Sequence, residues 1–153
     1  MNSINSNKIN YNELASLALK ARESAYAPYS GFYVGAAILD IYGRITTGVN
    51  VENSSYGATI CAERSAVARA ISTFDDYGGN IEDGIFLAIA IAGGAKTQEE
   101  VLSEFAFPCG ICRQVLSEFA VEDMRIIVVK SKDEFKVYKL HELIPYAFTK
   151  DSF

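Results

Sequence analysis

The sequence predicts an α/β fold, a three-layer α/β/α sandwich around a mixed sheet of about five strands. Two observations support this prediction. Segments whose apolar residues repeat at three-to-four spacing alternate with short strand-like segments along the chain. One of the strand-like segments, IFLAIAIAG from Ile85, is apolar throughout, as a central strand covered on both faces would be.

The first expected element is a helix at Tyr11–Tyr26, with Asn10 or Asn12 as its N-cap. Pro28 would stop this helix, because proline cannot continue a helical hydrogen-bond pattern. The apolar stripe of the helix consists of Leu14, Leu17, Ala18, Ala21 and Ala25.

A β-hairpin and a second helix are expected next. The hairpin joins strands at Phe32–Asp40 and Ile45–Asn53 through a turn at Gly43. The helix would run from Cys61 to about Phe74, with Thr59 as its cap. This helix therefore begins at a cysteine.

The second half of the chain is expected to contain three more strands and a second helix that begins at a cysteine. The expected elements, in chain order, are a strand at 85–93, a connection at 93–107 with a helical turn in EEVLSEF, a helix at 109–120 opened by Pro108, strands at 124–130 and 134–140, and a short helix at 140–148 broken by Pro145.

Length and composition predict one domain. The chain has 153 residues, half of them apolar, so residues 11–153 are expected to form a single catalytic domain after a polar leader at 1–10.

The net charge of -5 opposes binding to nucleic acid, and no apolar run approaches the ~18 residues of a membrane span. Three cysteines without a secretion signal favour reduced thiols and a cytoplasmic location.

Two cysteine motifs carry the chemistry. PCGICRQ places Cys109 and Cys112 one helical turn apart, and CAERSA adds Cys61 with Glu63 two residues later. Each motif opens a helix, where the partial positive charge of the helix end lowers thiol pKa values. Three thiolates would hold one zinc ion per chain and leave a coordination position for water, as in catalytic zinc sites. A glutamate that carries protons beside such a zinc is typical of zinc deaminases.

Other interpretations of these residues remain open at this stage. Cys109 and Cys112 alone could form a redox pair, although Cys61 would then be unexplained. His141 could complete a structural zinc site with the three cysteines. In that case the protein would be a non-catalytic zinc-stabilised interaction module, and Glu63 would be incidental.

The motifs CAERSA, PCGICRQ, FYVGAAIL, GVNVENSSYG and LIPYAF together resemble the small homotetrameric cytidine deaminases, over Tyr11 to Phe148. The resemblance implies hydrolysis of cytidine and deoxycytidine to uridine and deoxyuridine plus ammonia, in pyrimidine salvage. Glu63 would shuttle protons from the zinc-bound water to the ring nitrogen and then to the leaving amine. The resemblance also implies a homotetramer with active sites shared between subunits.

The resemblance extends to substrate contacts. It implies that Asn50 and Glu52 hydrogen-bond the ribose, that the backbone of Ala62 binds the base, and that Phe32 lies against the pyrimidine. The Glu52 carboxylate would also repel a phosphate, which favours a nucleoside over a nucleotide.

Three further positions match residues that act between subunits. Ser54 and Tyr56 match positions that line a neighbouring subunit's site, and Phe148 matches a phenylalanine that reaches across the tetramer.

Arg64 is expected to support the metal centre. It follows Cys61 by three residues on the same helical face, so it can donate hydrogen bonds to cysteine sulfur and offset the negative charge of three thiolates. The resemblance implies the same role.

One residue departs from the family pattern. Phe107 stands before the Pro-Cys pair, where relatives usually carry serine. If that position contributes only its backbone carbonyl, the phenylalanine leaves the pocket unchanged. If the side chain lines the pocket, the phenylalanine changes its shape. A blasticidin S-type deaminase shares the zinc motifs and is the alternative enzyme, but the intact VNVEN segment argues against it.

Overall fold

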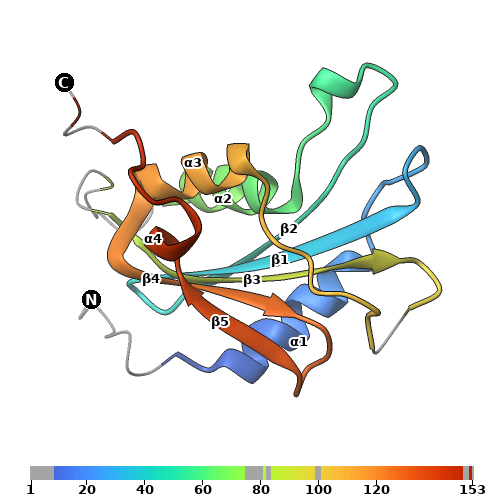
Figure 1. Ribbon diagram of the computed structural model, residues 1–153, viewed down its shortest axis with the longest axis horizontal. Coiled ribbons are helices and arrows are strands. Elements are labelled where there is room, and N and C mark those ends of the chain that lie inside the picture. The colour runs from blue at the N-terminus through green and yellow to red at the C-terminus, as the bar shows by residue number, and fades with distance from the viewer. Residues whose placement is uncertain (1–8, 75–80, 82–83, 99–100, 150–151, 153) are drawn as a thin grey trace.

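The computed structural model describes residues 9–74, 81, 84–98, 101–149 and 152, and these form one five-stranded sheet flanked by helices (Figure 1). The strand order is β2-β1-β3-β4-β5; β3 and β4 pair in parallel and the other neighbours pair antiparallel. The predicted fold class is therefore confirmed. The strands are β1 (Phe32–Asp40), β2 (Ile45–Val49), β3 (Phe86–Ala95), β4 (Ala120–Val129) and β5 (Phe135–Lys139).

Helices cover both faces of the sheet. In Figure 1, α1 (Tyr11–Arg22) lies below the sheet, and α2 (Ala62–Ser72) and α3 (Gly110–Phe119) lie above it. A one-turn helix, α4 (Leu140–Leu143), packs on the same side as α2 and α3. None of the helices in the described part of the chain has the length and apolar character of a membrane span.

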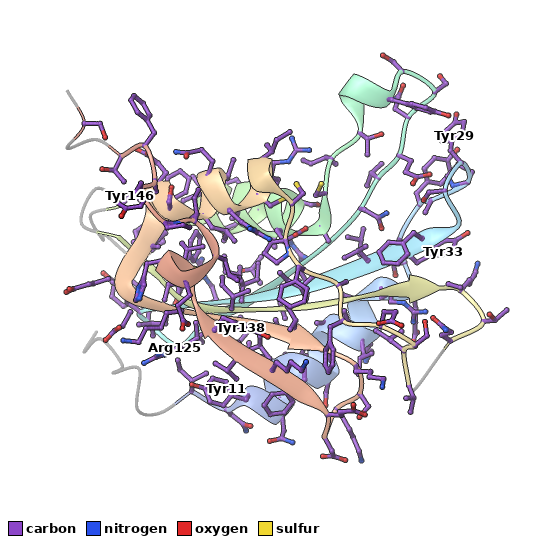
Figure 2. All side chains as sticks on the ribbon, in the orientation of Figure 1. Tyr11, Tyr29, Tyr33, Arg125, Tyr138 and Tyr146 are labelled. Carbon is purple, nitrogen blue, oxygen red and sulfur yellow. The ribbon has the colours of Figure 1, made fainter. Side chains whose placement is uncertain are left out.

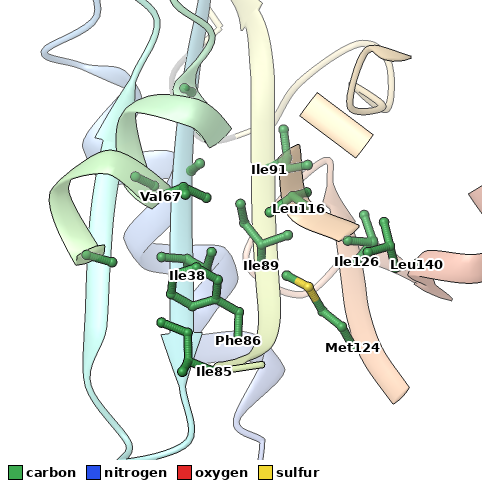
Figure 3. Close-up of a cluster of buried hydrophobic side chains, with 14 of the residues drawn as sticks. Ile38, Val67, Ile85, Phe86, Ile89, Ile91, Leu116, Met124, Ile126 and Leu140 are labelled. Atoms are coloured by element: carbon green, nitrogen blue, oxygen red, sulfur yellow. The ribbon is translucent and has the colours of Figure 1, made fainter. Parts of the chain in front are cut away.

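The alternation of side chains along each strand divides the core in two. Ile38 and Ile89 point toward α2 and α3, where they join the cluster drawn in Figure 3. Their neighbours Ala37 and Ala88 point toward α1. Small residues on that second face allow α1 to pack closely, and at Gly35 an added Cβ would lie 2.2 Å from the carbonyl oxygen of Ala18.

The first helix is shorter than predicted. Asn10 caps α1 through its side chain, as expected, but the helix ends at Arg22 rather than at Tyr26. The backbone of Tyr26 instead pairs with the segment after β2: its N–H donates to Asn50 and its carbonyl accepts from Glu52. This long-range pairing, and not Pro28, removes Tyr26 from the helix.

Several other boundaries differ from prediction. Thr59 does not cap α2, because Cys61 occupies the N-cap position and the Thr59 hydroxyl accepts from the Asn53 N–H. β2 ends at Val49, α2 ends at Ser72, and β4 begins directly after α3 at Ala120.

The predicted loop at 93–107 and the predicted C-terminal helix are also wrong in part. β3 continues through Gly93 and Gly94 to Ala95, where it still pairs with β1. Residues 101–107 form no helix; Glu99 and Glu100, and most of the predicted leader (residues 1–8), lie outside the described residues. The last helix stops at Leu143, before Pro145.

Close contact between β2 and α2 gives the first prediction. An added Cβ at Gly48 would lie 2.2 Å from the backbone nitrogen of Ala66, so Gly48→Ala should force α2 away from the sheet. We expect the free energy of unfolding, measured with urea, to fall by about 1–3 kcal/mol. Gly57→Ala is the matched control, because nothing lies within 4 Å of its Cβ position. Equal stabilities for the two variants would contradict the prediction.

Candidate active site

The three cysteines meet where α2 and α3 begin. Cys61 and Cys109 are the N-cap residues of α2 and α3, and Cys112 lies in the first turn of α3. Their sulfur atoms all lie within 4.8 Å of one another, and those of Cys61 and Cys109 are 3.9 Å apart. The structure thus brings together residues that are 48 positions apart in the chain.

This geometry fits a zinc ion. Zinc–thiolate bonds of about 2.3 Å in a tetrahedral site put neighbouring sulfur atoms about 3.8 Å apart, close to the separation of Cys61 and Cys109. His141 is exposed on α4 and does not belong to the ligand group. The set therefore provides three sulfur ligands, and the interpretation as a structural site with His141 is wrong.

The electrostatics of the thiols favour a cation between them. A hydrogen bond from Cys112 lowers the pKa of the Cys61 thiol to about 5, and Arg64 acts in the same direction. The same hydrogen bond and burial raise the pKa of Cys112. The two neighbouring thiols thus shift in opposite directions, because they share one hydrogen bond. A divalent ion would displace the proton of this hydrogen bond and balance all three sulfur atoms.

Two positive sources support the thiolates. Cys61 and Cys109 occupy the N-cap positions of α2 and α3, where the partial positive charge of each helix N-terminus favours a thiolate. Arg64 adds a full charge: its Nη2 lies 3.0 Å from the Thr59 carbonyl oxygen and 3.8 Å from Cys61 Sγ. The predicted contact between Arg64 and cysteine sulfur is present, and Thr59 helps to hold it.

Glu63 is a buried carboxylic acid next to the sulfur atoms. It lies in the first turn of α2 and is only 4% exposed. Burial, reinforced by the negative charge of Cys61, raises the pKa of Glu63 to about 7. A carboxyl group of this kind can take up and release a proton near neutral pH.

A cleft of about 290 Å³ opens onto Cys61, Cys109 and Glu63. Four of the predicted substrate contacts line it, namely Phe32, Asn50, Glu52 and Ala62. They come from the start of β1, the segment after β2 and the start of α2, which together form part of its walls.

The polar side chains of the cleft are held by the backbone around them. Asn50 is 8% exposed; its Oδ1 accepts from the Val34 N–H at 2.8 Å and its Nδ2 donates to the Phe32 carbonyl at 2.9 Å. The Glu52 carboxylate accepts from the Ser30 hydroxyl and from the N–H groups of Tyr29 and Ser30. The Ser30 hydrogen bond, with help from the backbone, lowers the pKa of Glu52, so this side chain is charged at neutral pH.

The three residues expected to act between subunits do not line the cleft. Ser54 and Tyr56 are exposed, on the loop that carries η2 (Tyr56–Ala58) and projects at the upper right of Figure 1. Tyr56 stacks edge-on against Tyr29, with ring centroids 6.1 Å apart. Phe148 is 63% exposed and follows Tyr146, which lies at the opposite end of the molecule from Tyr29 in Figure 2.

Several wall residues were not predicted as site residues. Phe107 is one of them: it lines the cleft, is 45% exposed, and has its ring centroid 5.5 Å from that of Tyr138 on β5. Its ring packs against β5, so the side chain makes a contact of its own in addition to the carbonyl. The position of Phe107 before the Pro-Cys pair could have identified it from the sequence. No motif pointed to the remaining wall residues, which are Ser30, Val34, Thr59, Ile91 and Ala106.

Comparison with known proteins gives consistent matches over most of the chain. Residues 8–129 match the family model described as the cytidine and deoxycytidylate deaminase zinc-binding region. A cytidine deaminase of Halalkalibacterium halodurans is 40% identical over 86% of this chain and 89% of its own length, and one of Sporosarcina psychrophila is 41% identical over 86% of each chain. The crystal structure of a cytidine deaminase from Burkholderia pseudomallei superimposes with a TM-score of 0.76 at 36% identity, covering 92% of this chain and all of that one.

The contacts of Arg64 yield the second prediction. Arg64→Ala should reduce the zinc retained after dialysis, because it removes the guanidinium beside Cys61 Sγ; we expect retention to weaken about 10- to 100-fold. Metal content can be measured by atomic emission. Arg69→Ala is the matched control, since Arg69 lies exposed on the same helix and donates to the Thr47 carbonyl. Unchanged metal content and turnover would remove Arg64 from the site.

Proposed function

Since the chain belongs to the cytidine and deoxycytidylate deaminase zinc-binding family, we propose that it hydrolyses cytidine and deoxycytidine to uridine and deoxyuridine, releasing ammonia. One observation carries the proposal: three cysteine sulfur atoms and a buried glutamate meet at one end of a cleft of about 290 Å³. That volume is near the lower limit of about 300 Å³ for small-molecule pockets, as a single nucleoside requires.

The metal and the glutamate divide the chemistry. Zinc held by Cys61, Cys109 and Cys112 supplies a Lewis acid that activates water for attack on the amine-bearing carbon of the base. Glu63 takes the proton from the attacking water and gives it to the adjacent ring nitrogen. It then takes the remaining proton from the new hydroxyl group on that carbon and transfers it to the amine, so that the carbonyl forms as the C–N bond breaks and ammonia leaves. Burial raises the pKa of Glu63 above its usual range, which helps this side chain to hold a proton between the two transfers.

The opposite end of the cleft is suited to the sugar. Glu52 is charged and its carboxylate is oriented by Ser30, so it can accept a hydrogen bond from a ribose hydroxyl while repelling a phosphate. Asn50 supports this end by tying the backbone of Phe32 and Val34, and its amide keeps one donor and one acceptor lone pair for the sugar. Phe32 offers an aromatic face to the base, and the Ala62 backbone a hydrogen bond.

We also propose that the protein assembles as a homotetramer with shared active sites. Tyr56 is 76% exposed and Phe148 is 63% exposed, and large exposed apolar side chains at both ends of a chain suit contacts between subunits. Ser54 and Tyr56 would then line a neighbouring subunit's cleft, and Phe148 would reach across the interface. We further propose that residues 11–153 act as one catalytic domain, in pyrimidine salvage in the cytoplasm, a reducing compartment suited to three unpaired thiols.

The substrate proposal is tested by ammonia release from cytidine, deoxycytidine, cytosine, CMP and blasticidin S. We expect turnover of both nucleosides, and a kcat/KM for CMP at least about tenfold lower because the phosphate would approach Glu52. Glu52→Gln should reduce this discrimination. Absence of turnover with either nucleoside would refute the proposal, and turnover of blasticidin S alone would favour the alternative deaminase.

The role of Glu63 is tested separately. Glu63→Gln should keep one zinc per chain and lower kcat by about 10²- to 10⁴-fold, because the amide cannot carry a proton. Glu118→Gln, on the exposed side of α3, serves as the control and should match the wild-type enzyme. A Glu63→Gln variant with full activity would show that Glu63 is not the proton carrier.

A further inference from the structure

Arg113 follows Cys112 directly in the second cysteine motif and has no part in the chemistry described above. Its guanidinium makes two hydrogen bonds to distant backbone. Nε donates to the Pro108 carbonyl at 2.8 Å, and Nη1 donates to the Leu143 carbonyl at 2.7 Å. The side chain thus connects the turn that carries Cys109 with the end of α4.

The turn around Cys109 needs such support. Cys109 is exposed, so its side chain has little packing to fix it, and it lies just outside α3 with φ -69° and ψ 168°. The backbone N–H of Arg113 donates to the Cys109 carbonyl at 3.0 Å. The side-chain Nε of the same residue donates to the preceding carbonyl, that of Pro108. One residue therefore binds the carbonyl groups on both sides of the Cys109 α-carbon.

The second contact ties this turn to a rigid part of the molecule. α4 begins at Leu140, which is buried in the core cluster with Leu116 of α3. Leu143 packs at the edge of the same cluster. Gln114 adds a neighbouring link from its Nε2 to the Phe148 carbonyl at 2.7 Å. The C-terminal segment is thus held against the metal-binding helix at two consecutive residues.

We propose that Arg113 is a positioning residue that keeps the Cys109 sulfur within reach of Cys61 and Cys112 by bracing the Pro108–Cys109 turn against α4. This inference rests on the proposed zinc-dependent function. Arginine suits the role because its planar guanidinium donates in two directions at once, whereas lysine presents one compact charged group. Loss of the brace should chiefly accelerate the loss of zinc.

The test measures zinc transfer from the loaded enzyme to an excess of a colorimetric chelator. Arg113→Gln should release zinc about 10- to 100-fold faster than the wild-type enzyme, the range seen when groups that orient metal ligands are removed. Arg113→Lys should release zinc at a rate between those of Arg113→Gln and the wild-type enzyme. Arg69→Gln is one control, because it also removes a helical arginine that binds a backbone carbonyl. Gln114→Ala is the other control, because it removes only the hydrogen bond to the Phe148 carbonyl. Both controls should release zinc at the wild-type rate.

A second measurement separates positioning from general stability. Thermal unfolding is recorded with and without zinc: Arg113→Gln should show a smaller increase in Tm on zinc binding than the wild-type enzyme. In the zinc-saturated variant KM should stay unchanged, since Arg113 does not line the cleft. Equal zinc-release rates for Arg113→Gln and the wild-type enzyme, or a Tm lowered equally with and without zinc, would overturn the proposal.

The two proposals fail in different ways. A wild-type protein that binds no zinc would refute the proposed function before any variant is compared. A wild-type protein that binds zinc and deaminates cytidine, with Arg113→Gln releasing zinc at the same rate, would refute the role of Arg113 alone.

Discussion

The crowding of three cysteine sulfur atoms within 4.8 Å is the constraint on which the site depends. Three thiolates so close together repel one another strongly unless positive charge lies among them. The protein supplies part of it from the N-termini of α2 and α3 and from Arg64, and a divalent cation supplies the rest. The three sulfur ligands therefore need two helix ends brought to one point.

The sheet makes that meeting possible. Gly48 lets α2 lie close against β2, and α3 connects the parallel strands β3 and β4 on the same face, so both helices begin beside the same cleft. Arg64 then fixes Cys61 through the Thr59 carbonyl. Arg113 makes analogous contacts at Pro108 and Leu143. Each exposed or half-exposed ligand is thus accompanied by an arginine that binds nearby backbone.

The same cleft holds two carboxyl groups in opposite environments. Burial raises the pKa of Glu63 beside the cysteines, whereas hydrogen bonds from Ser30 and the backbone lower the pKa of Glu52 in another part of the cleft wall. One group is poised to exchange protons and the other remains a fixed negative charge. The two side chains are identical, so the difference between their pKa values comes from solvation and hydrogen bonding.

The sequence alone determined the fold class, the three cysteines and Glu63, because strand and helix periods and the spacing of ligands are local patterns. It did not reveal that Tyr26 leaves the first helix to pair with Asn50 and Glu52, or that Thr59 serves Arg64 rather than capping α2. Nor did it show that the Phe107 ring packs against Tyr138, or that Arg113 reaches α4. These features join segments far apart in the chain, so only the packed tertiary structure, which sets their distances, could decide them.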